Sequence, residues 1–115
     1  MNMDKEIELN NKFIKYFNFD HVLPVNLNEL SKRQQSEFLK YTRNLNHLEL
    51  MVGQLTSDLD AYGWKVGLNC LQGVFGATFE CFDNYTATGS STREALALLI
   101  SDILDEIKLG NLQPS

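Results

Sequence analysis

The turn GSSTRE at residues 89–94 has residue types that could bind a phosphate group. A glycine lets a ligand approach the backbone, the N–H groups of a helix start attract anions, and Arg93 adds positive charge. The same letters also form a capping box, in which the Ser91 hydroxyl accepts from the N–H of Glu94 and the Glu94 carboxylate reaches back to the N–H of Ser91. We favour the capping box, because the turn lacks the Gly-Lys-Ser/Thr ending of a nucleotide-binding loop and because Glu94 repels an anion.

The helix predicted after this turn carries an acidic cluster. Asp102, Asp105 and Glu106 are spaced three and four residues apart, so they share one side of a helix. The opposite side is apolar, with Leu96, Leu99, Ile100, Ile103, Leu104 and Ile107. The acidic side is either a solvated helix face or a negative surface that meets a basic groove on a partner.

Metal-binding and catalytic residue sets are not complete in this chain. Asp58 and Asp60 form an Asp-x-Asp pair, but residues two apart on a helix point in different directions and no Cys, His or Glu set completes a metal site. His21 and His47 are not accompanied by a serine or cysteine nucleophile motif. We therefore expect no metal, no cofactor and no enzymatic activity.

Charge is unevenly distributed along the 115 residues. The net charge is −5, which argues against a general nucleic-acid binder. Residues 31–47 are basic and residues 48–115 carry nine acids against three bases. The bases of the first segment can share one side of a helix, as a solvated face or as a patch that receives the acidic part of a second copy: Lys32, Arg33, Lys40 and Arg43.

Composition predicts a soluble globular chain of the cytoplasm. Hydrophobic residues make up 43% of the sequence, and the longest apolar run, residues 95–100, is far shorter than the ~20 residues of a membrane span. The amino terminus does not have the basic and apolar pattern of a leader. Cys70 and Cys81 are expected to be reduced core thiols.

Hydrophobic periodicity predicts helices in residues 1–62. An amphipathic helix is expected over residues 4–17, with Pro24 turning the chain after it. A heptad stripe then runs through residues 31–62, opened by a capping box of Ser31 and Gln34 and closed by Gly63. A continuous helix would be about 48 Å long. We favour a break at residues 44–46; the alternative is an unbroken helix whose far end packs on another molecule. The stripe comprises Phe38, Tyr41, Leu45, Leu48, Val52, Leu55, Leu59 and Tyr62.

After residue 63 the hydrophobic period changes to two. Residues 64–70, 75–81 and 85–88 are predicted strands of an antiparallel meander, with turns at residues 72–73 and 83–84, and the carboxy-terminal helix packs on it. The fold class is therefore α+β, with a helical lobe at residues 1–62 and a βββα lobe at residues 63–115 that share one core.

The strand followed by TATGSSTREALALLI resembles the end of the double-stranded-RNA-binding domain. In that family a lysine pair at the helix start holds phosphates. Here Thr92 and Arg93 replace that pair and the helix becomes acidic, so the resemblance does not extend to RNA binding.

Taken whole, the short acidic chain and its run GWKVGLNCLQGVFGATFECFDNYTATGSSTREAL resemble the phage and prophage inhibitors of host defence, among them the type I-F anti-CRISPR proteins. The resemblance implies an inhibitor that binds the CRISPR-Cas surveillance complex in the host bacterial cytoplasm and blocks target DNA with a DNA-mimicking acidic surface. Partner-binding candidates, chosen on charge, are Asp58, Asp60, Glu80, Asp83, Glu94, Asp102, Asp105 and Glu106.

Two other functions fit the same sequence. One is a phage protein that sequesters a nucleotide signal at residues 89–93, with Trp64 or Tyr85 stacked on the base. The other is a structural or interaction protein that forms homo-oligomers through the heptad stripe.

Overall fold

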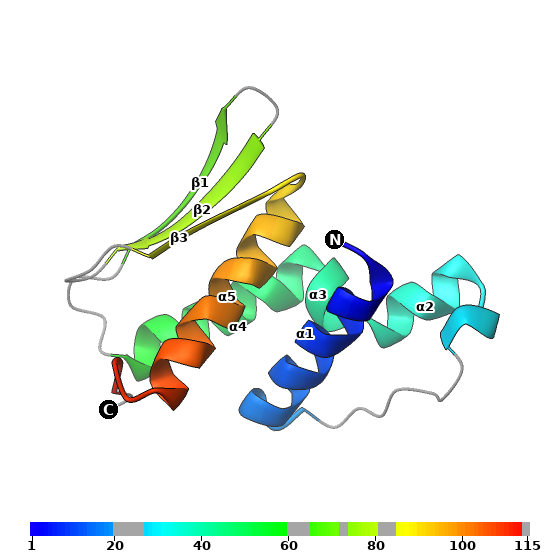
Figure 1. Ribbon diagram of the computed structural model, residues 1–115, viewed down its shortest axis with the longest axis horizontal. Helices are drawn as coiled ribbons and strands as arrows, with labels where there is room; N and C mark the ends of the chain where they lie inside the picture. Colours follow the sequence, from blue (N-terminus) through cyan, green and yellow to red (C-terminus); the bar gives the residue numbers. More distant parts are fainter. Residues whose placement is uncertain (20–26, 60–64, 72–73, 81–84, 114–115) are drawn as a thin grey trace.

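The computed structural model describes residues 1–19, 27–59, 65–71, 74–80 and 85–113. The fold is α+β, as predicted (Figure 1). In chain order its elements are α1 (Met3–Phe17), the short 3-10 helix η1 (Leu27–Glu29), α2 (Lys32–Phe38), α3 (Lys40–Arg43), α4 (Leu45–Asp58), β1 (Lys65–Leu71), β2 (Val74–Glu80), β3 (Tyr85–Gly89) and α5 (Thr92–Lys108).

Helix α1 is bounded by two asparagines. The side chain of Asn2 accepts from the Lys5 N–H at 2.8 Å and satisfies one of the donors of the first turn. Asn18 ends the helix in the left-handed region, at φ 57°, a conformation that asparagine tolerates better than most residues. Between these ends Leu9 and Phe13 point into the core, so the helix predicted for residues 4–17 is confirmed.

The stripe of residues 31–62 is divided among three helices. The predicted capping box of Ser31 and Gln34 opens α2, and the favoured break at residues 44–46 is confirmed. Asn44 leaves the helical conformation, and its side chain accepts from the N–H groups of Asn46 and His47 to begin α4. The sequence pattern did not predict the second break, at Leu39.

Asn10 explains why the chain can break at Leu39. Its side chain is fully buried, and its amide donates to the Phe38 carbonyl at 3.1 Å while its oxygen accepts from the Tyr41 N–H at 3.2 Å. Both backbone groups flank Leu39, whose own side chain is fully buried. The polar groups released by the break thus find partners on α1 rather than in water.

The stripe packs inside the chain. Leu48, Val52, Leu55 and Leu59 belong to the hydrophobic core, together with residues of α1, α5, β2 and β3. These four residues of the stripe are therefore used for packing within the chain, and association of two copies through the stripe stays a prediction. Tyr62 and the predicted helix end at Gly63 lie outside the described residues.

The sheet has the strand order β1-β2-β3, with antiparallel pairing throughout. The buried Ala77 of β2 lies opposite the buried Ala87 of β3, which places small side chains where α5 approaches the sheet. The turns predicted at residues 72–73 and 83–84, as well as Cys81, lie outside the described residues.

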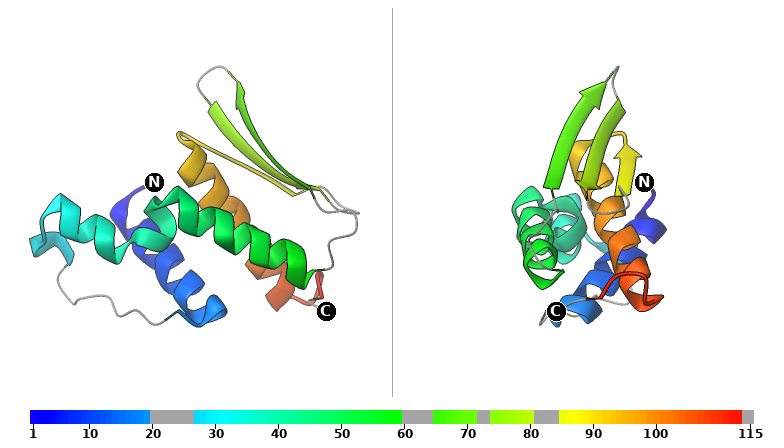
Figure 2. Two further views of the ribbon diagram at one scale, coloured as in Figure 1. Left: turned by 180° about the vertical axis from the view of Figure 1, so that it is seen from behind. Right: turned by 90° about the vertical axis from the view of Figure 1, so that its left-hand side faces the viewer.

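Helix α5 is the central element of the fold. It lies between the sheet on one side and the helices α1, α3 and α4 on the other (Figures 1 and 2). Its predicted apolar side is confirmed, because Leu96, Leu99, Ile100, Ile103 and Leu104 are buried. Within the described ranges, none of the helices has both the length and the apolar character that crossing a membrane requires.

Candidate functional site

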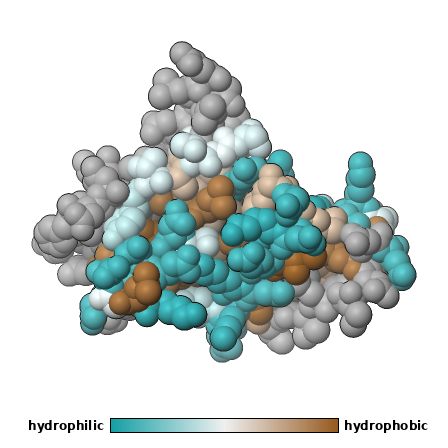
Figure 3. Space-filling model, viewed as in Figure 1, coloured by the Kyte–Doolittle hydropathy of each residue, from teal (hydrophilic) through white to brown (hydrophobic). Residues whose placement is uncertain are grey.

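The exposed side of α5 carries the acidic cluster that the sequence predicted. We call Asp102, Asp105 and Glu106 the α5 acidic face. Asp102 and Asp105 are exposed and Glu106 is half-buried, and the Glu106 carboxylate accepts from the Asn111 amide at 2.7 Å. In Figure 3, hydrophilic surface covers much of the region where α1 and α5 lie at the front, with hydrophobic patches between.

Lys12 of α1 lies against this face. Its ammonium group donates to the Asp105 carboxylate, to the Ser101 hydroxyl at 2.8 Å and to the Ser101 carbonyl at 3.2 Å. The pair with Asp105 is partly solvated, since 55% of the Asp105 side chain is exposed. Because α1 supplies a lysine from outside the helix, one of the three carboxylates has a partner that the sequence did not predict.

The pKa of Asp102 nevertheless lies above its ordinary value. The larger cause is partial desolvation of the carboxyl group, although the residue as a whole is exposed, and the second cause is the neighbouring charge of Asp105. Lys12 and Lys5 act in the opposite direction, and Glu106 adds a smaller upward effect. The three carboxylates are therefore close enough to interact, and the two lysines oppose their effect on Asp102.

Glu94 belongs to the start of α5 and not to this face. Its N–H donates to the Ser91 hydroxyl at 3.1 Å, so half of the predicted capping box is confirmed. Its carboxylate accepts from the Ser90 hydroxyl at 2.9 Å and from the amino group of Met1 at 3.1 Å, in place of the bond predicted from the Ser91 N–H. These contacts, the Ser90 hydroxyl first, lower the pKa of Glu94.

Gly89 is required by packing rather than by a ligand. A Cβ atom at this position would lie 2.8 Å from Cγ of Glu94 and 2.9 Å from the backbone nitrogen of Ala95. The space above the glycine is therefore filled by the first turn of α5. Tyr85, at the other end of β3, packs against the core, and Trp64 lies outside the described residues. The geometry does not support nucleotide sequestration with Tyr85 stacked on a base at residues 89–93.

Asp58, another predicted carboxylate, is not part of the α5 acidic face. Asp58 lies at the end of α4, where it accepts from the Gln54 amide at 2.8 Å. Glu80 ends β2, and its side chain lies outside the described part of the structure. Asp60 and Asp83 are likewise outside the described residues. Among the candidates whose side chains are described, the structure thus brings together Asp102, Asp105 and Glu106.

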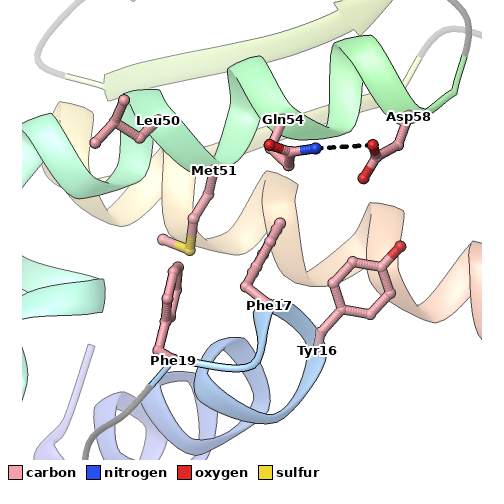
Figure 4. A pocket seen from close by; sticks show the side chains of 7 residues that line it. All are labelled: Tyr16, Phe17, Phe19, Leu50, Met51, Gln54 and Asp58. Atoms are coloured by element: carbon pink, nitrogen blue, oxygen red, sulfur yellow. Dashed lines mark hydrogen bonds between the residues drawn. The ribbon is translucent and has the colours of Figure 1, made fainter.

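A groove between α1 and α4, which the sequence analysis missed, lies beside Asp58. Figure 4 shows its lining of Tyr16, Phe17, Phe19, Leu50, Met51, Gln54 and Asp58. Leu50 is 71% exposed, whereas Met51 is buried. Burial, followed by the charge of Asp58, raises the pKa of Tyr16. Neither Leu50 nor Met51 belongs to the heptad stripe, so periodicity gave no signal for the groove.

A basic hollow forms where α2, α3 and α4 meet the start of α5. Arg33, Lys40, Arg43, His47 and Arg93 line it together with Glu37. The sequence placed three of these bases in one patch, and Arg93 joins them through its Nη1 group, which donates to the Arg43 carbonyl at 3.1 Å. Lys32, the fourth base of the predicted patch, is not among the lining residues.

The described residues contain no group of three or more His, Cys, Asp and Glu side chains that could hold a metal ion. Comparison of the chain with protein-family models, with curated proteins and with solved structures gives no match. The surfaces described above are therefore the basis of the functional proposal.

Proposed function

We propose that this chain is a non-enzymatic binding protein that presents the α5 acidic face to a positively charged surface of a macromolecular partner. The grouping of Asp102, Asp105 and Glu106 on one side of a helix whose opposite side is buried carries this proposal. Such a face favours association with basic surfaces through electrostatic complementarity.

Before its lysine partner is counted, the α5 acidic face approaches the charge density of DNA; with Lys12 paired to Asp105 the net density is roughly half that of DNA. From Asp102 to Glu106 the helix rises by about 6 Å, and duplex DNA carries one negative charge per ~1.7 Å of its axis. Three carboxylates over this length therefore approach the three to four phosphate charges, roughly, that DNA would present there. Lys12 offsets one of them.

The more specific form of the proposal follows the resemblance to type I-F anti-CRISPR proteins. In this form the partner is the RNA-guided surveillance complex, and the α5 acidic face occupies the place of the target-DNA phosphates. The set of interacting residues is narrower than charge alone suggested, because Asp58 and Glu94 make other contacts.

The test is competition with target DNA for a purified type I-F surveillance complex, measured by fluorescence anisotropy of labelled DNA. The wild-type chain is expected to displace the DNA. The double variant Asp102→Asn/Glu106→Gln is expected to weaken inhibition by about tenfold or more, because desolvated charge pairs across an interface contribute strongly to binding. Asp105 is left unchanged, so that Lys12 keeps its partner.

The matched control is Glu29→Gln/Glu49→Gln, which removes two exposed charges from η1 and α4. It alters the net charge equally and is expected to inhibit like the wild type. If both double variants inhibit equally, the α5 acidic face is not the binding surface. If the wild type does not displace DNA, the type I-F complex is not the partner. The general proposal would then be retained only by a different partner that binds the wild type and does not bind the Asp102→Asn/Glu106→Gln variant.

A further inference from the structure

We propose a second binding site, independent of the α5 acidic face: the basic hollow of Arg33, Lys40, His47 and Arg93 binds a phosphate group of a small ligand. The hollow has a volume of about 460 Å³. It adjoins a second hollow of about 530 Å³, which shares Arg43, Asn44 and Arg93 as lining residues. These dimensions are in the range of small-molecule sites.

Arg43 fixes the geometry of the hollow but is not available to a ligand. Its guanidinium group forms a two-pronged ion pair with Glu6, with one contact from Nη2 at 3.1 Å, and its Nη1 donates to the Ser36 hydroxyl at 3.1 Å. The side chain is only 26% exposed. Glu6 lies on α1, so this pair holds the α3–α4 junction against α1 and presents the neighbouring cations from a fixed base.

The other cations are directed to the same hollow from three different elements. Arg33 comes from α2, Lys40 from α3 and Arg93 from α5. No ion pair engages any of these three within the described part of the chain. Glu37 is the acidic residue of the lining, so the three cations exceed the fixed negative charge. An excess of positive charge in a chain of net charge −5 favours an anionic ligand at this place.

The chemistry of the lining favours a phosphate group over a larger aromatic ligand. Guanidinium groups bind phosphate oxygens in a two-pronged geometry, and an ammonium group adds a point charge. Ser36 and Asn44 add polar side chains, and the lining residues of the two hollows include no Tyr, Trp or Phe. A nucleobase would therefore find no Tyr, Trp or Phe ring to stack on, and the His47 ring already packs edge-on against Tyr41. On the other side of Arg43, Glu6 and Glu94 line a third hollow, which limits the site to the side of α2 and α4.

Binding can be measured by isothermal titration of the full chain with inorganic triphosphate, adenosine triphosphate and adenosine, at constant ionic strength. The two triphosphates are expected to bind alike, with a Kd of about 1 mM or tighter, and adenosine is expected not to bind. Amide chemical shifts are expected to change at Arg33, Ser36, Lys40, His47 and Arg93.

The double variant Arg33→Gln/Lys40→Gln is expected to weaken triphosphate binding by about tenfold or more. The control Lys15→Gln/Lys108→Gln removes the same net charge from exposed positions of α1 and α5 and is expected to change Kd by less than about twofold. Equal losses in both double variants would show that only net charge matters and would overturn the proposal. So would an absence of triphosphate binding to the wild type at about 10 mM, shift changes confined to other residues, or binding of adenosine alone.

Discussion

Replacement of Asn10 by alanine is expected to destabilise the fold strongly, although the residue lines neither of the proposed binding surfaces. The side chain has no solvent exposure and bonds the backbone on both sides of the Leu39 break. Its removal leaves the buried Tyr41 N–H without this acceptor and the partly buried Phe38 carbonyl without this donor.

The magnitude follows from these two groups. A buried backbone group without a partner costs about 1–3 kcal/mol. The Phe38 carbonyl is only partly buried and can be reached by water more easily, so the sum is expected to be about 2–4 kcal/mol. With an m-value of about 2 kcal/mol per M, the middle of the range for small proteins, the urea midpoint is expected to fall by roughly 1–2 M.

Urea unfolding followed by circular dichroism measures this change, and the adjacent Asn11 provides a matched control. Asn11 is exposed, so Asn11→Ala makes the same chemical change on the same helix without loss of a buried bond. We expect this control to lie within about 0.5 kcal/mol of the wild type. Equal effects of the two substitutions would refute the view that Asn10 holds the break between α2 and α3.

Three further predictions concern packing and charge. Gly89→Ala is expected to lower the free energy of unfolding by about 1–3 kcal/mol, because the added Cβ atom would overlap the first turn of α5. Gly53→Ala is expected to stabilise α4 by about 0.5–1 kcal/mol, because no atom lies within 4 Å of the added Cβ atom. Thermal unfolding of both variants measures the contrast. Lys12→Gln is expected to lower the free energy of unfolding by about 1 kcal/mol, through loss of the bonds to α5, and the exposed Lys15→Gln to leave it unchanged; a smaller loss at Lys12 than at Lys15 would contradict this. Folding raises the pKa of Asp102, so the folded state binds a proton more tightly than the unfolded state does. The contribution of this group to stability therefore falls as the pH rises from the ordinary to the raised pKa, and it stays constant above the raised pKa. Asp102→Asn is therefore expected to raise the melting temperature at neutral pH, with a gain that vanishes below pH ~4; a gain that persists there would contradict the sign.

Helix ends were the features most accurately predicted from local sequence. The Ser31–Gln34 box opens α2, and Ser91 begins α5 with its hydroxyl accepting from Glu94. The Asn44 break was also predictable, since an asparagine flanking the stripe can accept from the backbone two and three residues later. Each of these contacts joins residues at most three positions apart, so a short stretch of sequence is sufficient to predict it.

The break at Leu39 could not be predicted in the same way. Continuation of the heptad through Phe38 and Tyr41 is a regular local pattern, and no local cap marks Leu39. The backbone groups beside the break bond to the side chain of Asn10, which lies 28 residues before Phe38 and 31 residues before Tyr41. Residues 4–17 show only the pattern of an amphipathic helix, and an asparagine on the buried side of such a helix carries no recognisable signal.

The charged surfaces likewise combine features that follow from local spacing with features that depend on long-range contacts. By itself the sequence determined the spacing of Asp102, Asp105 and Glu106 on one helix side, because that spacing depends only on helical geometry. Packing of distant elements was needed to bring Lys12 to Asp105 across 93 residues and Arg93 to the Arg43 carbonyl across 50. Periodicity and capping act over one or two turns, whereas ion pairs and hollows form wherever packed elements bring distant side chains within a few ångströms of each other.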